Sequence, residues 1–304
     1  MPKSARVRSP RLCLRCASIH LYKSGVNMRW KQFLTPVKSL NAPEAKEYLS
    51  KLSLDEYNLV DVRQPGEYKS GHIPGARLIP VAEVAERSRE LDPTKPTFVY
   101  CAIGGRSRVA AQMLAGQGFA RVFNMSGGIK AWNSDTAVGT ADTGMALFSG
   151  HEETEEVLLT AYALEAGLQD FYTSMQGRVA QEEVQSLFSK LSTIEVKHQE
   201  RIFAEYQEVS PSPLSREEFA RKAERQAMEG GLTTEEYLAL YPTDFEVAGE
   251  VLSLAMAIEA QALDLYLRAA DNCAKEAASR ALLRIAEEER THLKLLGDLL
   301  DETI

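Results

Sequence analysis

Two pairs of glutamate and histidine are the residues in this sequence whose spacing most clearly suggests chemistry. Glu195 precedes His198 by three residues, and Glu289 precedes His292 by the same interval. On an α-helix, residues three apart lie on one face, so each pair would present a carboxylate and an imidazole about one turn apart. Such a pair can supply two ligands to a metal ion. Apolar residues flank both pairs, as expected of a buried helix face: Leu187, Leu191, Ile194, Leu282, Leu283 and Ile285.

The surroundings of the two pairs are also repeated. A further glutamate, Glu165 or Glu259, lies 30 residues upstream of each Glu-x-x-His pair. Each upstream glutamate is followed at matched spacing by an aspartate and a tyrosine: Asp170 with Tyr172, and Asp264 with Tyr266. A single Glu-x-x-His pair most commonly lies on a solvent-exposed helix face and binds no metal. Here, however, the chain has only five histidines, and two fall at matched positions of the repeat. The C-terminal half is therefore predicted to be a helical hairpin that occurs twice.

This set of residues resembles the rubrerythrin and ferritin-like family over about residues 151–304. The resemblance implies an all-α four-helix bundle whose lone glutamates and Glu-x-x-His pairs meet at one centre. It further implies two bound iron ions, with manganese as the alternative, and an oxidoreductase that reduces peroxide or O₂ with electrons from an external donor. Mixed carboxylate and imidazole ligands suit these metals better than zinc. The predicted ligands are Glu165, Glu195, His198, Glu259, Glu289 and His292.

Two features depart from the rubrerythrin pattern. The chain has no rubredoxin module to deliver electrons, and Ala262 stands where typical rubrerythrins carry a further glutamate ligand. Peroxidase activity is thus less firmly implied than metal binding. The two repeated tyrosines, Tyr172 and Tyr266, are expected either to donate hydrogen bonds to ligand carboxylates or to pack in the core.

The second candidate for chemistry is the segment CAIGGRS at residues 101–107, between a predicted strand and a predicted helix. A turn of this kind can aim several backbone N–H groups and the positive end of a helix at one point. These groups would favour the thiolate of Cys101, which is the nucleophilic form. Arg106 would add a positive fork suited to an oxyanion. The alternative is an inert buried cysteine in a plain turn.

This loop and its surroundings resemble the rhodanese family over about residues 35–135. The segment DVRQPGEYKSGHIPGA at 61–76 matches that family's first signature, and residues 127–129 with Trp132 match its closing segment. The resemblance implies that Cys101 takes a sulfane sulfur from thiosulfate or a similar donor and passes it from a persulfide to a thiol acceptor or cyanide. The six-residue loop favours sulfur over the larger phosphate group. The implied substrate-binding residues are Gly104, Gly105, Arg106 and Ser107, with Asp61, Arg63, Glu67 and His72 as structural supports.

Alternating short strands and helices between residues 41 and 132 predict a parallel α/β sheet. Strands are expected at 58–62, 96–100 and 122–124, and helices at 81–89 and 106–117. In the second half, apolar positions from Val157 to Met175 predict one helix, and a second carries Glu195 and His198 before prolines end it. Residues 214–243 make a long connection containing a helix at 216–229. Helices three and four are expected at 244–272 and 275–301.

The whole chain is accordingly predicted to be multidomain. We expect a leader at 1–27, an α/β rhodanese-like domain at 28–135, a linker at 136–150 and an all-α ferritin-like bundle at 151–304. The Gly- and Thr-rich segment 134–150 is typical of a flexible linker. The basic leader is open to three interpretations: a disordered arm, a targeting peptide, or a start codon placed before Met28. Its single C-x-x-C, Cys13 to Cys16, lacks the second pair that a structural metal site needs.

Charge and composition exclude several classes of protein. Residues 1–150 carry 21 basic and 12 acidic side chains, whereas residues 151–304 carry 14 basic and 31 acidic ones. The second half therefore has a formal charge of −17, which argues against nucleic acid as its partner. No apolar run reaches the ~18 residues of a membrane span. The four cysteines form no disulfide framework, so a cytoplasmic location is expected.

Three functions fit these residues. The first is a bifunctional sulfurtransferase and di-iron oxidoreductase, acting on a small sulfane donor, a thiol acceptor and an external electron donor. The second is a metal-handling or storage module with an auxiliary sulfurtransferase. The third is a persulfide sensor without turnover. A homodimer is also expected, because ferritin-like bundles often pair through helix faces.

Overall fold

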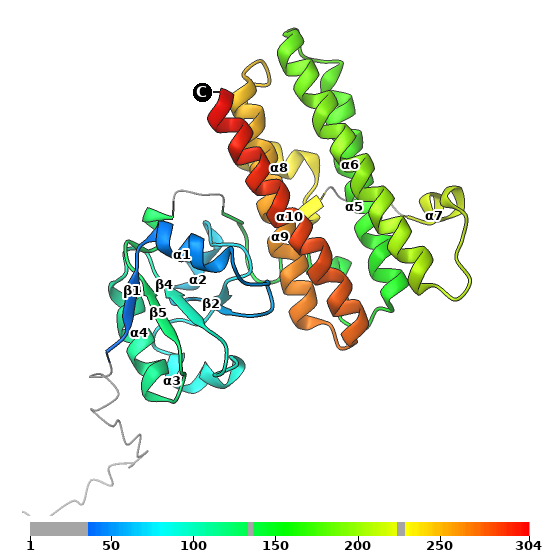
Figure 1. Ribbon diagram of the computed structural model, residues 1–304. Helices are drawn as coiled ribbons and strands as arrows, with labels where there is room; N and C mark the ends of the chain where they lie inside the picture. Colours follow the sequence, from blue (N-terminus) through cyan, green and yellow to red (C-terminus); the bar gives the residue numbers. More distant parts are fainter. Residues whose placement is uncertain (1–35, 133–135, 224–228, 304) are drawn as a thin grey trace, which may run out of the picture.

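The chain forms two parts, a parallel α/β sheet followed by a helical bundle (Figure 1). The computed structural model describes residues 36–132, 136–223 and 229–303. The leader and the Cys13 to Cys16 pair lie outside the described residues. Among the described residues, no helix is long and apolar enough to cross a membrane.

The sheet has five parallel strands in the order β1-β5-β4-β2-β3. Its central strand β4 is fully buried, as a continuous apolar run between two helical layers requires. The three predicted strands are present, but the short edge strands β1 and β3 had no clear sequence signal. The strands are β1 (Lys38–Leu40), β2 (Asn58–Asp61), β3 (Arg77–Leu78), β4 (Thr97–Tyr100) and β5 (Val122–Met125).

Helices cover both faces of the sheet: α1 (Ala42–Leu49), α2 (Pro65–Lys69), α3 (Val84–Arg87) and α4 (Gly105–Gly116). Side chains alternate across the strands, so Leu59 and Phe98 enter one core while Val60 and Val99 enter the other. The helix predicted at 81–89 is present as α3 followed by a 3₁₀ turn, η2 (Ser88–Glu90).

The bundle consists of two helical hairpins. They are formed by α5 (Thr154–Gln176) with α6 (Glu182–Val209) and by α9 (Ala248–Asn272) with α10 (Glu276–Thr303). The connection between the hairpins contains α7 (Arg216–Lys222), which is shorter than predicted, and α8 (Thr234–Leu240), which was not predicted. Both short helices begin with a capping box, at Ser215 and Thr233, in which the hydroxyl accepts from the backbone N–H three residues on.

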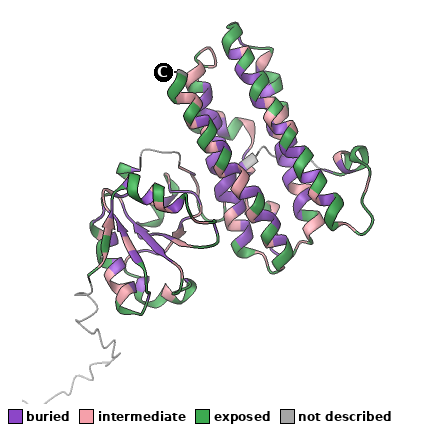
Figure 2. Cartoon of the chain, viewed as in Figure 1, coloured by how far each residue is buried: buried purple, intermediate pink, exposed green. Residues whose placement is uncertain are grey.

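The bundle core is divided into two apolar clusters by a layer of buried polar groups. Along α5, Leu164 belongs to one cluster and Leu168 to the other, with Glu165 buried between them. Along α9, Ile258 and Ala262 likewise fall in different clusters, on either side of buried Glu259. Figure 2 shows the buried stripe that each long helix turns inward. The repeat in the sequence therefore places its polar residues at one level of the bundle.

The sheet domain packs against the α9 and α10 hairpin (Figure 1). The buried Asp264 of α9 accepts a hydrogen bond from the backbone N–H of Gly75 at 2.9 Å, and its other oxygen lies 3.3 Å from His72 Nε2. Glu287 of α10 accepts from the N–H of Leu54 at 2.9 Å. The turn that contains His72 and Gly75 therefore forms part of the contact with the bundle.

The expectation of a flexible linker is corrected by the structure. Val138 exchanges two hydrogen bonds with the buried Gln261 side chain, and Arg268 donates to the carbonyls of Ala141 and Thr143. Phe148 is 3% exposed and belongs to the bundle core. The glycines and threonines that suggested flexibility instead allow the backbone to approach α9 closely, so that its peptide groups can bond to bundle side chains.

Candidate functional site

Cys101 lies directly after the central strand β4, and the loop that follows it leads into α4. Gly104 at the helix N-cap has φ +100°, a conformation that favours glycine. A Cβ atom there would also lie 3.2 Å from the backbone nitrogen of Gly127. The loop therefore curls tightly enough to return its N–H groups toward the cysteine.

The sulfur of Cys101 is surrounded by hydrogen-bond donors. The N–H of Gly104 donates to Sγ at 3.1 Å, and the Ser107 hydroxyl lies 3.5 Å away. Burial by itself would raise the pKa of Cys101, but hydrogen bonds from the backbone N–H groups of Ser107, Ile103 and Gly104 hold that pKa below its ordinary value. The loop thus stabilises the thiolate of Cys101 relative to the thiol, and the catalytic role of this cysteine stays a prediction.

The closing segment, residues 127–132, holds the loop through backbone hydrogen bonds. The N–H of Ile129 donates to the Cys101 carbonyl at 2.9 Å, and that of Lys130 donates to the Ala102 carbonyl at 3.3 Å. A Cβ atom on Gly128, which has φ +58°, would lie 2.2 Å from the Cys101 carbonyl oxygen. Only glycine fits here, because the two backbones are in contact.

Arg106 is held by Glu67. Its Nη1 and Nη2 each donate to a Glu67 carboxylate oxygen at 2.7 Å, and this ion pair lowers the pKa of Glu67 to about 2. In this structure both of these nitrogens are engaged by a support residue, and the role of Arg106 in binding a substrate anion stays a prediction. Arg106 still places positive charge beside Cys101. Two other support residues, Asp61 and Arg63, form a buried ion pair of 2.7 Å.

Ser107 lies beneath Cys101 and is fully buried, and Gly105 is exposed at the start of α4. The Ser107 hydroxyl donates to Asn124 Oδ1 at 2.7 Å, and Asn124 Nδ2 donates to Ser39 Oγ at 3.0 Å. Sequence reasoning missed Asn124. A buried polar residue within the apolar strand β5 was the signal that could have found it.

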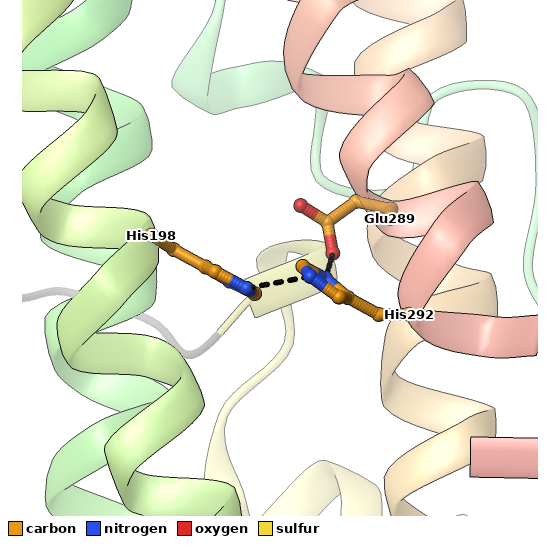
Figure 3. A group of neighbouring side chains, drawn as sticks. All are labelled: His198, Glu289 and His292. Atoms are coloured by element: carbon orange, nitrogen blue, oxygen red, sulfur yellow. Dashed lines mark hydrogen bonds and ion pairs between the residues drawn. The ribbon is translucent and has the colours of Figure 1, made fainter. Parts of the chain in front are cut away.

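In the bundle, the structure brings all six predicted metal ligands to the polar layer between the two apolar clusters. None of these residues is more than 9% exposed. His198 Nδ1 lies 3.2 Å from a Glu165 oxygen and 3.1 Å from a Glu195 oxygen. The other ring nitrogen of His198 is 2.8 Å from Nε2 of His292. Figure 3 shows these two imidazoles reaching toward each other from α6 and α10, with Glu289 beside His292.

The donor atoms fall into two overlapping groups. Glu165, Glu195 and His198 place one ligand atom each within 4.8 Å of one another, and so do His198, Glu289 and His292. Glu259 joins the second group through a hydrogen bond with Glu289. Two cations with a shared or bridging ligand fit this arrangement better than one cation with six separate ligands.

The chemistry of these buried groups also fits a metal. Glu195 Oε1, Glu259 Oε2 and His292 Nδ1 are buried with no hydrogen-bond partner among the described residues. Burial raises the pKa of Glu259 to about 7, and burial with the nearby His198 lowers that of His292 to about 3. Lone pairs left unsatisfied in an apolar core are costly, and divalent cations would satisfy them.

Tyr172 and Tyr266 are both buried in the bundle core. Tyr172 packs beside Phe171 and Phe188, and Tyr266 lies edge-on to Phe148. Both rings therefore pack in the core, and hydrogen bonds from their hydroxyls to ligand carboxylates stay a prediction.

Comparison with known proteins agrees with the two folds. The model of the rhodanese-like domain family matches residues 42–135, and the rubrerythrin model matches residues 156–300. The chain therefore belongs to the rhodanese-like proteins, with a rubrerythrin domain joined to it.

Several curated proteins are similar to part of the chain. It is 41% identical to the thiosulfate sulfurtransferase GlpE of Pseudomonas entomophila over 28% of this chain and 81% of that protein. It is 43% identical to the uncharacterized protein YqhL of Bacillus subtilis over 24% of this chain, and 38% identical to the putative sulfur carrier protein YrkF of the same species over 29%. The chain spans only 59% of YqhL and 49% of YrkF.

Among solved structures, a rhodanese-like domain protein from Staphylococcus aureus is 28% identical to this chain. The similarity covers 34% of this chain and 100% of that chain, with a TM-score of 0.32. A rhodanese with anions from E. coli has 33% identity, covers 27% of this chain and 99% of that chain, and has a TM-score of 0.26.

Proposed function

We propose that the first domain transfers sulfane sulfur through a persulfide on Cys101. The observation that carries this proposal is the ring of donors around Sγ, which lowers the pKa of a buried thiol. A cysteine that was only part of the core would have its pKa raised by burial. The similarity to thiosulfate sulfurtransferases supports the same chemistry.

In the proposed reaction, the Cys101 thiolate attacks the outer sulfur of thiosulfate. A new S–S bond forms, the original S–S bond breaks, and sulfite leaves with its electron pair. The backbone N–H groups of Gly104 and Gly105, at the N-terminus of α4, would stabilise the negative outer sulfur of the persulfide. An acceptor thiolate then attacks that sulfur, and the Cys101 thiolate is released. Arg106 supplies positive charge for binding the donor dianion.

Measurement of thiosulfate:cyanide sulfur transfer in the native protein and in Cys101→Ser tests this proposal. The native protein should turn over and gain the mass of one sulfur atom at Cys101 after thiosulfate treatment, and the variant should do neither. A native protein that forms the persulfide without turnover would instead indicate a sensor.

We further propose that the bundle holds two iron or manganese ions and reduces peroxide or O₂. The observation that carries this is the buried polar layer of Glu165, Glu195, His198, Glu259, Glu289 and His292. A bound pair of iron ions would supply two electrons to an oxidant. The chain's part is to orient the ligands on four rigid helices and to exclude bulk water with the apolar clusters above and below.

Metal content per chain, measured on protein loaded with iron or manganese, tests this second proposal. The native protein should bind about two ions, and His198→Ala, which removes a residue shared by both ligand groups, should retain fewer than one. Consumption of hydrogen peroxide by the iron-loaded protein with a chemical reductant then tests the oxidoreductase activity. Full metal binding without peroxide or O₂ consumption would favour metal handling.

A further inference from the structure

A chain of three buried or half-buried polar side chains leads away from the Cys101 sulfur through the sheet. Ser107 is 0% and Asn124 1% exposed, and Ser39 on β1 is half-buried. Ser107 Oγ is 3.5 Å from Sγ and 2.7 Å from Asn124 Oδ1, and Asn124 Nδ2 is 3.0 Å from Ser39 Oγ. No water is needed to complete this path, because each member contacts the next directly.

The Ser107 hydroxyl has one hydrogen and two acceptors within reach. The contact to Asn124 has the ordinary length of an O–H···O bond, whereas 3.5 Å to sulfur is long. The hydrogen therefore belongs to the Asn124 bond. In this arrangement the Ser107 hydroxyl can accept a hydrogen bond from the Cys101 thiol. It contributes little stabilisation to the Cys101 thiolate, because its hydrogen points to Asn124.

We propose that Asn124 is a positioning residue that turns the Ser107 hydroxyl away from Cys101 and so sets how readily the cysteine forms and releases its persulfide. Ser39 fixes the direction of the Asn124 amide by accepting from its Nδ2. The remaining donors to Sγ are the backbone N–H groups of Ser107, Ile103 and Gly104, which do not depend on the Asn124 side chain.

This role has a chemical consequence for sulfur transfer, and that part rests on the function proposed above. A thiolate with fewer donors is more basic and more nucleophilic, but it is a poorer leaving group. Asn124 would therefore favour capture of sulfur from the donor and slow the loss of sulfur to the acceptor. The positive charge beside Cys101 is that of Arg106, which forms an ion pair with Glu67 of α2. Within the described part of the chain, the Asn124 side chain bonds to Ser107 and Ser39 and to neither of these two charged groups.

The test is the pH dependence of alkylation at Cys101 by iodoacetamide, followed by peptide mass spectrometry, so that the other cysteines do not contribute. In Asn124→Leu the Ser107 hydrogen is free to turn to sulfur, and the pKa of Cys101 should fall by about one unit, the effect of one added bond to a charged group. Preformed persulfide should also pass its sulfur to cyanide faster. An unchanged or raised pKa would overturn the proposal.

The double variant Ser107→Ala with Asn124→Leu separates positioning from general packing. If Asn124 acts through Ser107, Asn124→Leu should have no effect on the pKa of Cys101 when Ser107 is alanine, and a persisting shift would refute the mechanism. Ser39→Ala provides a milder variant should the leucine disturb the sheet: a smaller fall is expected, and no fall contradicts the role of Ser39 and Asn124. Alkylation does not require turnover, so failure of the sulfurtransferase proposal would leave this result readable.

Discussion

Replacing Asp264 should weaken the contact between the two domains. Burial acts to raise the pKa of this carboxylate, but Arg268, His72 and the Gly75 N–H together lower it from 3.8 to about 2. Because the folded-state pKa is depressed, the stabilisation is present above pH ~4 and is lost as the pH falls toward about 2. The difference between the two pKa values corresponds to about 2.5 kcal/mol. Asp264→Ala, which also leaves its donors unpaired, should cost about 3 kcal/mol.

Two optical probes can follow this change. The chain's two tryptophans both precede the bundle, and Trp132 is buried in the core of the first domain, so a change in its fluorescence reports on that domain. Far-UV circular dichroism is dominated by the four long helices of the bundle. In urea at pH 7, the two signals of the native protein should change together. In Asp264→Ala, both midpoints should fall, and the fluorescence midpoint should fall further.

Asp271→Ala is the matched control, because Asp271 lies on the same helix and pairs with Arg77 across the same interface, but its side chain is 65% exposed. An exposed pair of this kind should contribute less than about 1 kcal/mol. The reasoning is refuted if Asp264→Ala unfolds at the same urea concentration as the native protein, or if both variants lose the same stability.

Three other variants test the sites. Glu195→Ala should lower bound iron by at least half, measured by plasma mass spectrometry, while sulfur transfer at Cys101 is retained; intact iron binding would contradict the ligand role. Gly128→Ala should abolish sulfur transfer, because its Cβ would overlap the Cys101 carbonyl, and normal transfer rates would show that the loop has room. Glu67→Gln should leave the positive charge of Arg106 unneutralised and lower the KM for thiosulfate several-fold at low salt. Salt at ~0.5 M should remove this effect by screening the charge. A raised KM would mean that Glu67 matters mainly for orienting Arg106.

The bundle could be predicted in detail because its signal is local and repeated. The spacing of Glu165, Glu195, Glu259 and Glu289 already implies matched positions on four helices, since an α-helix converts spacing into direction. The short edge strands and α8 were missed, because a few residues carry too little periodic signal. Asn124 was missed for a different reason: its partners Ser39 and Ser107 become neighbours only when the sheet forms.

Residue types and helical period by themselves specify two metal-ligand hairpins and a cysteine loop with glycines at its tight turns. They do not decide which members of the repeat are buried. Asp170 and Asp264 occupy the same place in the two copies, yet Asp170 is exposed and Asp264 is fully buried against the first domain. The reason is that burial depends on which helix faces a neighbouring domain. Only the packing of α9 on the turn at His72 and Gly75 made one aspartate an interdomain contact and left the other in solvent.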